Sequence, residues 1–324
     1  MNFIQKMASH FSKNMLFYTL GIVLVGTTVS LLGDFRGLSK LVLPVVFLMI
    51  YPMMINVSFE SLKNVKYAVN PLLVALALNF VVSPLLFYLF CLVFRVPTTI
   101  RISLILLAVA PSSSMGLGYV GLSKGNIVSA SVIVAFTFLL SMVVYPVTFH
   151  FLGVVSESYP FTEILKDLLL VLILPLTLGV LTREFLERKF KIEHRRIKPL
   201  LSLLNILALY LLISIIFLTK GKMIVQHWKN SLLVAPVSAL YYLTAISSAI
   251  LLNRYAVRLS YEDHQAVVFT TVSKNVALTI GLLATSFASG QLAMYPAIVS
   301  LFQIIFLMSY LHLSERIQKW WSKS

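Results

Sequence analysis

The chain consists of long apolar stretches separated by short polar connections. Windows of about 18 to 25 apolar residues, enough for a helix to cross the hydrocarbon core of a bilayer, occur ten times. They lie at about 15–32, 38–56, 71–94, 100–121, 126–152, 163–183, 199–219, 231–252, 263–288 and 291–313. The pattern predicts an all-α polytopic membrane protein. No polar stretch is long enough for a separate aqueous domain, so we expect residues 1–324 to form a single membrane domain.

The ten predicted spans divide into two halves of five near residue 160. Because each half holds an odd number of spans, two halves with the same fold would lie in opposite orientations in the membrane. We therefore expect two inverted five-helix repeats, at about 15–152 and about 163–313. Inverted repeats are typical of secondary transporters.

Polar residues interrupt the fourth span of each half. In span 4 they follow Pro111, which lacks a backbone donor, and they are Ser112, Ser113 and Ser114. In span 9 they are Thr270, Ser273, Lys274 and Asn275. For the three serines of span 4, the simpler interpretation is that their hydroxyls bond back to the preceding helical turn. In the alternative, both helices unwind here, which membrane proteins tolerate only where the backbone lines a cavity or is buried in protein.

Lys274 is the only charged residue deep within a predicted span. A charge at that depth is costly and usually functional. All eleven acidic residues lie in loops or at span ends, so the lysine and two helix N-termini at the breaks would favour an anion. A structural role, in which the ammonium binds carbonyls freed by the break or snorkels, remains open. Burial disfavours the charged form of lysine, which makes protons a candidate coupling partner.

Other polar residues within the spans are weaker candidates for the same site. We single out Asn79 in span 3, Ser129 in span 5 and Gln303 in span 10 as binding candidates. The commoner role of such side chains in membrane helices is a hydrogen bond between helices.

Composition and charge support this interpretation. Hydrophobic residues make up 59% of the chain and charged residues 11%. With the N-terminus inside, 17 of the 26 basic residues fall in cytoplasmic segments and 8 in external ones, so we expect both termini in the cytoplasm and the protein in the plasma membrane. The net charge of +15 then reflects topology and attraction to membrane lipid, and nucleic-acid binding is not indicated.

Motifs for metals, cofactors and catalysis are missing from the sequence. There is one cysteine, Cys91, and the six histidines do not follow a metal-binding spacing. We find no phosphate-binding loop and no pair of aspartates within the spans. We therefore expect no enzyme activity, no catalytic residue, no metal, no cofactor and no obligate protein partner.

Four short motifs resemble the bile acid/sodium symporter superfamily, and within it the arsenite-permease (arsenical resistance) branch. They are IYPMM at 50–54, LSKGN at 122–126, PLTLGVLTR at 175–183 and TVSKNVAL at 271–278. The resemblance implies two inverted five-helix repeats, with spans 4 and 9 broken and crossing in a core domain. It also implies a panel of helices that includes spans 1, 2, 6 and 7, substrate bound between core and panel, and alternating access.

At key positions this chain departs from both branches. The arsenite-permease motif places a cysteine at Ser112 and a glutamate at Ala277, so arsenite binding and carboxylate-linked proton exchange each lose a central group. The sodium-coupled branch has an acidic residue at Thr270 and an amide sodium ligand at Lys274. An ammonium at that place would repel a cation by about 1 to 4 kcal/mol. Our hypothesis is that Lys274 takes the place of a sodium ion.

Together these observations favour a secondary transporter for a small anionic solute, with an organic anion first among the substrates and no sodium coupling through the usual site. An efflux permease for arsenite or a related oxyanion is the alternative within the same class. An uncoupled channel and a membrane receptor are the alternatives outside it.

Overall fold

The computed structural model describes residues 3–56, 59–152, 169–189, 194–226, 228–286 and 291–322, together with residues 162 and 166. Within these residues the regular structure is helical apart from one isolated β-bridge. In this described part of the chain, eight helical segments are long and apolar enough to cross a membrane, and two shorter apolar helices lie in the predicted spans 4 and 9. The protein is therefore a polytopic, all-helical membrane protein. The beginning of predicted span 6 lies outside the described residues, apart from Lys166.

The helices group into two compact units. Unit 1 comprises Met1–Val57, Val154–Ser231 and Ala277–Ala297. Its elements are α1 (Phe3–Lys13), α2 (Met15–Leu32), the 3-10 turn Arg36–Leu41, α3 (Val42–Asn56), the π-turn Leu169–Ile173, α10 (Leu174–Lys189), α11 (His194–Gln226), α12 (Trp228–Leu232), most of α15 (Val276–Ser286) and the short turn Gln291–Ala293.

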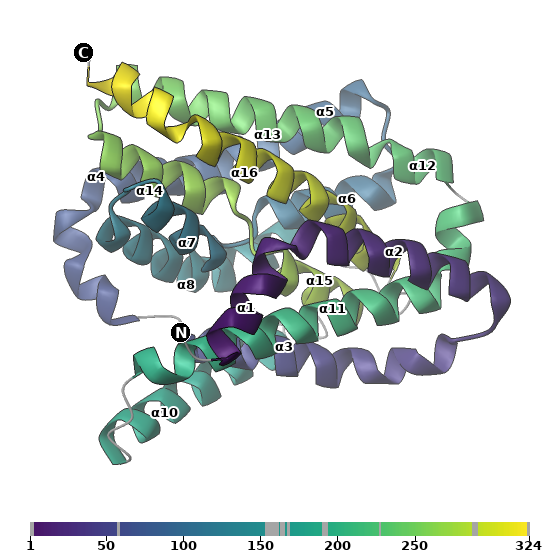
Figure 1. The fold of residues 1–324 in the computed structure, drawn as a ribbon. Helices are drawn as coiled ribbons and strands as arrows, with labels where there is room; N and C mark the ends of the chain where they lie inside the picture. The colour runs from purple at the N-terminus through teal and green to yellow at the C-terminus, as the bar shows by residue number, and fades with distance from the viewer. Residues whose placement is uncertain are drawn as a thin grey trace. The chain divides into compact units, whose positions relative to one another are not determined.

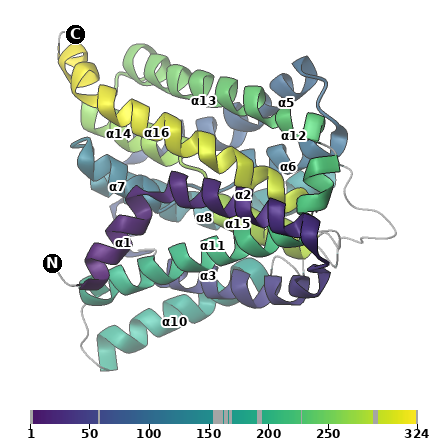
Figure 2. The ribbon, with the colours of Figure 1, turned by 45° about the vertical axis from the view of Figure 1, so that its right-hand side comes forward.

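In unit 1 the long helix α11 packs between α2 and α3, and α10 packs on α3 (Figure 1). A Cβ at Gly179 of α10 would lie 2.6 Å from the Met54 Cβ, so only glycine allows this close approach. The Tyr51 and Thr182 hydroxyls, 2.7 Å apart, join the same two helices. Helix α1 is tied to α11 by the Tyr210 hydroxyl, which donates to the Phe11 carbonyl over 2.9 Å. Figure 2 shows α1, α2 and α11 lying together from a second direction.

Unit 2 comprises Ser58–Gly153, Leu232–Val276 and Ile298–Ser324. Its elements are the 3-10 segment Phe59–Tyr67, α4 (Val69–Ala77), the π-turn Leu78–Val82, α5 (Ser83–Val93), α6 (Thr98–Ala108), α7 (Met115–Leu122), α8 (Ile127–Phe151), α13 (Val234–Leu251), the π-turn Leu252–Ala256, α14 (Tyr261–Val272) and most of α16 (Met294–Trp321).

Helix α14 is central to unit 2. Every residue from His264 to Val272 is buried, and α14 packs against α4, α7, α8 and α13. Helix α13 also packs on α5, where the Phe87 and Tyr241 rings stack with centroids 3.9 Å apart and the Tyr241 hydroxyl lies 2.9 Å from Ser83 Oγ. The polar break at the C-terminal end of α14 therefore follows a completely buried helical stretch.

Both predicted interruptions are real breaks. Predicted span 4 is divided into α6 and α7, and predicted span 9 into α14 and α15. Unit 1 holds the four spans that the resemblance assigns to the panel, together with most of α15. The inverted relation of the two halves and the orientation in the membrane stay predictions.

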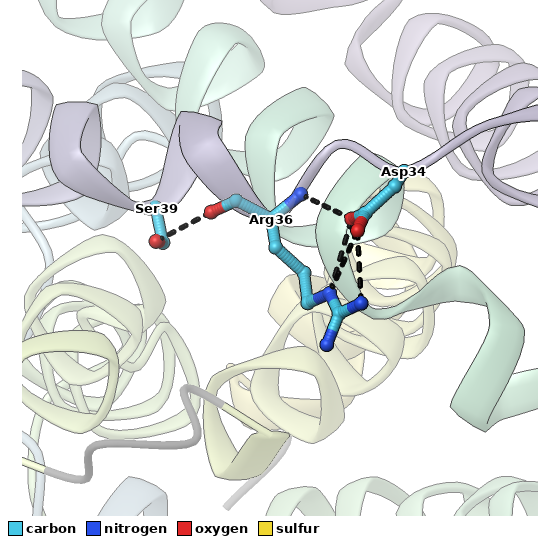
Figure 3. Close-up of polar contacts among 3 residues, drawn as sticks. All are labelled: Asp34, Arg36 and Ser39. Carbon is cyan, nitrogen blue, oxygen red and sulfur yellow. Dashed lines mark hydrogen bonds and ion pairs between the residues drawn. The ribbon is translucent and has the colours of Figure 1, made fainter.

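A loop between α2 and α3 holds an exposed ion pair (Figure 3). Arg36 Nη2 lies 2.9 Å from Asp34 Oδ2, and the Arg36 backbone N–H donates to Asp34 Oδ1 over 3.0 Å. Hydrogen bonds from Arg36 lower the pKa of the Asp34 carboxyl from 3.8 to about 2. The Ser39 hydroxyl donates to the Arg36 carbonyl over 2.7 Å, so the three residues form one local turn.

Candidate binding site

The two breaks meet in unit 2 and form what we call the crossing, residues 109–114 and 273–275. Ser112 and Lys274 pair as in an antiparallel β-bridge. The Ser113 N–H donates to the Ser273 carbonyl over 2.8 Å, and the Asn275 N–H donates to the Pro111 carbonyl over 2.9 Å. Each break thus supplies hydrogen-bond partners for the other, which satisfies backbone groups that lipid would leave unpaired.

Lys274 is 1% exposed and all three of its ammonium protons have acceptors. Its Nζ donates to Asn79 Oδ1 over 2.6 Å, to the Ala108 carbonyl over 2.6 Å and to the Asn79 carbonyl over 3.2 Å. The three acceptors are neutral oxygens from two different helical segments. A lysine bound in this way occupies an oxygen cage of the kind that hard cations prefer.

The Asn79 carbonyl is available to the ammonium because of local sequence. Asn79 lies in the π-turn Leu78–Val82, where the Ser83 N–H donates to the Leu78 carbonyl, five residues back. The same pattern would pair the Asn79 carbonyl with residue 84, but Pro84 has no N–H. A π-turn followed by a proline therefore frees one carbonyl inside a membrane helix, and Lys274 binds it.

Pro111 frees the second carbonyl. Helix α6 ends at Ala108, and the next residues whose N–H groups would reach its carbonyl are Pro111, which has none, and Ser112. The Ser112 N–H donates to Thr137 Oγ1 of α8 over 3.1 Å instead. The Asn79 side chain completes the arrangement by donating from Nδ2 to the Ala110 carbonyl over 3.0 Å.

Gln303 of α16 braces the unwound backbone of Lys274. Its Oε1 accepts from the Lys274 N–H over 2.9 Å, and its Nε2 donates to the Lys274 carbonyl over 3.3 Å. The Tyr242 hydroxyl of α13 donates to the same Oε1 over 3.2 Å. The amide thus pairs with Lys274 as a neighbouring β-strand would. Sequence reasoning singled out Gln303 but missed Tyr242, which carries no signal beyond being a tyrosine within a span.

Two hydroxyls at the crossing are buried and unused. Ser112 is 2% exposed and Ser273 0% exposed, and neither Oγ has a hydrogen-bond partner within the described part of the chain. A buried hydroxyl without a partner costs free energy. These two groups are thus candidates to bind a small solute.

A close backbone contact holds α7 against α14 next to the crossing. A Cβ at Gly116 would lie 2.7 Å from the Phe269 carbonyl oxygen, so a larger residue there would force the helices apart. The Tyr119 and Phe269 rings stack with centroids 5.5 Å apart one turn further along α7. Glycine is required here by packing.

The other predicted site residues have more ordinary environments. Thr270 Oγ1 donates to the Ala266 carbonyl over 2.6 Å, the simpler of the two predicted interpretations. Ser113 Oγ accepts from the Met115 N–H over 3.2 Å, and Ser114 is the residue that precedes α7. Ser129 Oγ donates to Asp263 Oδ1 over 2.7 Å, so the structure joins it to the start of α14 and not to Lys274. Whether any of these residues binds a solute stays a prediction.

No carboxylate contacts the Lys274 ammonium within the described residues. Ion pairs among the described residues include Asp34–Arg36 and Glu187–Arg183, both in unit 1. Groups of three or more potential metal-ligating side chains are also not found in the part of the chain that the structure describes. The crossing therefore combines a buried lysine that no carboxylate contacts within the described residues with two hydroxyls that have no hydrogen-bond partner there.

Comparison with known proteins identifies the family. A model described as the Sodium Bile acid symporter family matches residues 43–227, more than half of the chain. The chain belongs to this family. The match covers nearly all of α3 through α11, including the first break and the π-turn at Asn79, whereas the second break lies beyond the matched residues.

Similar proteins include arsenical-resistance proteins. One from Alkaliphilus metalliredigens is 26% identical over 216 residues, which cover 62% of this chain and 60% of that protein. Another, from Corynebacterium glutamicum, is 25% identical over 316 residues, 89% of this chain and 83% of that protein. An uncharacterized transporter of Synechocystis sp. is 23% identical over 306 residues, 86% of this chain and 78% of that protein. The resemblance expected from the four motifs, to the sodium bile acid symporter family and its arsenical-resistance branch, is confirmed.

Proposed function

We propose that this bile acid symporter family member is a secondary transporter that moves a small anionic solute across the plasma membrane by alternating access. The observation that carries the proposal is the oxygen cage around Lys274, in which three neutral oxygens within 3.2 Å hold an ammonium. The lysine acts as a tethered cation. It holds the crossing together and leaves it with a net positive charge.

The substrate class follows from that charge. The oxygens of the cage are neutral, so they orient the ammonium but do not cancel its charge. In a low-dielectric site an uncompensated cation attracts an anion over several ångströms. The Ser112 and Ser273 hydroxyls supply the donors that a carboxylate or similar anion needs, which favours a small organic anion.

A tethered cation also bears on coupling. An ammonium in the cage excludes a sodium ion from the same three oxygens. Transport therefore does not require sodium binding at the cage. Replacing Lys274 by glutamine should give the cage an amide, the side chain that the family resemblance implies for a sodium ligand here. We expect Lys274→Gln to acquire sodium-dependent thermal stability, while Lys63→Gln, which changes an exposed lysine of the same unit, behaves like the wild type.

A direct test uses purified wild-type protein. Thermal stability is measured against a set of small organic acids and arsenite, with and without sodium, and any ligand found is followed in proteoliposomes. We expect stabilisation by an organic anion that does not change with sodium, followed by uptake against a gradient. Stabilisation that requires sodium would contradict the tethered-cation role, and uptake that never exceeds equilibration would indicate a channel.

Efflux of arsenite or a related oxyanion is the second candidate, favoured by the two arsenical-resistance relatives. The crossing has Ser112 where the resemblance implies a cysteine, and a hydroxyl does not replace a soft sulfur ligand. If the scaffold still suits arsenite, Ser112→Cys should bind it at least about tenfold more tightly than the wild type. Tight arsenite binding by the wild type would instead favour efflux over organic-anion transport.

A further inference from the structure

An arginine and tryptophan cluster lies at one end of unit 2, apart from the crossing. We define it as Arg254, Tyr255 and Arg258, which follow α13, with Trp320 and Trp321 at the end of α16. Basic residues here fall in the segments that the charge distribution predicts to be cytoplasmic.

Arg254 is held against the tryptophans. Its guanidinium carbon lies 3.5 Å from the centre of the Trp320 ring and 5.4 Å from that of Trp321, and Nη1 donates to the Trp320 carbonyl over 2.8 Å. Its Nε is buried and has no hydrogen-bond partner within the described residues. The guanidinium is thus held in a fixed position while its Nε–H has no acceptor there. Buried arginine donors in folded proteins normally have acceptors.

Arg258 reaches the same place through an unusual backbone. It adopts φ 56°, in the left-handed region that a bulky residue seldom occupies, and its side chain is exposed. The loop is anchored next to it, because Trp321 Nε1 donates to the Leu259 carbonyl over 3.0 Å. Across the described chain no hydrogen bond or ion pair involves the Arg258 side chain.

The two arginines line one cavity of about 470 Å³, together with Tyr255, Leu259 and Trp321. None of the described residues that line it is acidic. Asp263 lies beside a neighbouring cavity that shares Arg258, but its Oδ1 already accepts from Asn126 and Ser129. The cavity therefore presents two positive charges and aromatic walls without a carboxylate to neutralise them.

We propose that this cavity binds the phosphate group of an anionic phospholipid. Paired guanidinium groups suit phosphate oxygens, and the exposed Arg258 side chain, which lines the cavity, has its donors available. Lipid is favoured over free phosphate because large apolar side chains next to the cavity are exposed, Tyr255 by 61% and Leu251 by 57%, and would contact acyl chains. Tryptophan and tyrosine prefer this depth of the bilayer, and the cytoplasmic leaflet carries the anionic lipids.

Lipid binding to purified protein tests the proposal independently of any transported substrate. Affinity is measured by thermal shift for dioctanoyl phosphatidylglycerol, dioctanoyl phosphatidylcholine and inorganic phosphate. We expect phosphatidylglycerol to bind the wild type about tenfold more tightly than it binds the double variant Arg254→Gln with Arg258→Gln. Phosphatidylcholine should bind both proteins equally weakly.

A matched control is available within unit 2. Arg101 also lies over an aromatic ring, 5.7 Å from the centre of Tyr88, but at the end of the unit predicted to be external. Arg101→Gln should therefore keep wild-type affinity for phosphatidylglycerol. Should the double variant fail to fold, Arg258→Gln alone serves, because that exposed side chain has no partner to lose within the described residues.

Three results would overturn the proposal. They are equal affinity of the wild type for phosphatidylglycerol and phosphatidylcholine, unchanged affinity in Arg258→Gln and the double variant, and an equal loss in Arg101→Gln. If inorganic phosphate stabilises the protein as much as the lipid does, the site is one for free phosphate and the lipid assignment fails.

Discussion

Lys274 and Arg36 show two opposite ways of keeping a charge in this protein. Lys274 is 1% exposed, and among the described residues its ammonium donates to neutral oxygens alone. The side chain of Arg36 is 81% exposed and faces a carboxylate that is 58% exposed. Lys274 has no counterion in the described part of the chain, and its ammonium instead makes three hydrogen bonds, because water cannot solvate it at this buried place.

The comparison shows that the effect of a charged side chain on stability depends on its burial. Water and salt screen the exposed pair, so its contribution to stability is small even at 2.9 Å. At the crossing each neutral oxygen matters, since losing one leaves a buried donor or acceptor unpaired. We therefore expect substitutions at the crossing to change stability and transport, and substitutions at the ion pair to change little.

The largest effect is expected for Lys274→Met, which replaces the side chain by an unbranched apolar one that is one heavy atom shorter and has no donors. Three buried acceptors would lose their partner, which we expect to cost about 2–4 kcal/mol of unfolding free energy. Anion uptake should fall at least about tenfold, because the positive charge is gone. Unfolding in detergent and uptake in proteoliposomes measure the two effects, with Lys63→Met as the exposed-lysine control.

Lys274→Met would contradict our interpretation if uptake stayed at the wild-type level. A loss of stability without a loss of uptake per folded molecule would leave Lys274 with the structural role alone. The effects on stability and on uptake can be separated, because the amount of folded protein is measured before reconstitution.

A smaller and sharper effect is expected for Asn79→Asp. The substitution preserves shape and keeps an acceptor for the ammonium. It loses the Nδ2 hydrogen bond to the Ala110 carbonyl, and its negative charge cancels the charge of Lys274. We expect the protein to remain folded while its affinity for an anion falls about tenfold, as loss of the net attraction predicts. Asn79→Leu is the comparison: it removes the 2.6 Å hydrogen bond without adding charge and should mainly lower stability. Equal anion affinity in Asn79→Asp and the wild type would argue against an electrostatic role.

The sequence predicted the breaks better than it predicted their partners. Pro111 and Lys274 identified both unwound segments, because a proline removes a backbone donor from a span and a charge within a span is costly. Asn79 and Gln303 emerged as candidates, but their hydrogen bonds to Lys274 depend on how distant helices pack. Ser129 looked equally suitable and lies against Asp263 instead.

One signal at the crossing was readable and was missed. Pro84 lies five residues after Asn79, the spacing at which a π-turn leaves a carbonyl without a donor. A proline in a span therefore indicates a free carbonyl as well as a bend, and a buried lysine elsewhere in the chain indicates what binds it. The choice between substrates depends on contacts that no single residue pattern specifies.

The unused hydroxyls at the crossing give a third, weaker test. Ser112→Ala and Ser273→Ala remove buried polar atoms that have no recorded partner, so stability should stay constant or rise by up to about 1 kcal/mol. Uptake should decrease in both, because the substrate loses a donor. Ser141 is a matched control: its buried hydroxyl already donates to the Phe138 carbonyl over 2.6 Å, and its removal should leave uptake unchanged. A marked loss of stability in Ser112→Ala would mean that the hydroxyl has a structural role.

The smallest effect is expected at the exposed pair. The pKa of Asp34 is lowered from 3.8 to about 2, so any stability that the pair contributes is fully present above pH 3.8 and is lost as the pH falls through about 2. Arg36→Gln should return the pKa of Asp34 toward 3.8, which carboxyl-carbon NMR can follow. The Tm at neutral pH should change by less than about 1 °C, because water already solvates both groups. A change as large as that of Lys274→Met would show that exposure does not separate the two charges, and the comparison between them would fail.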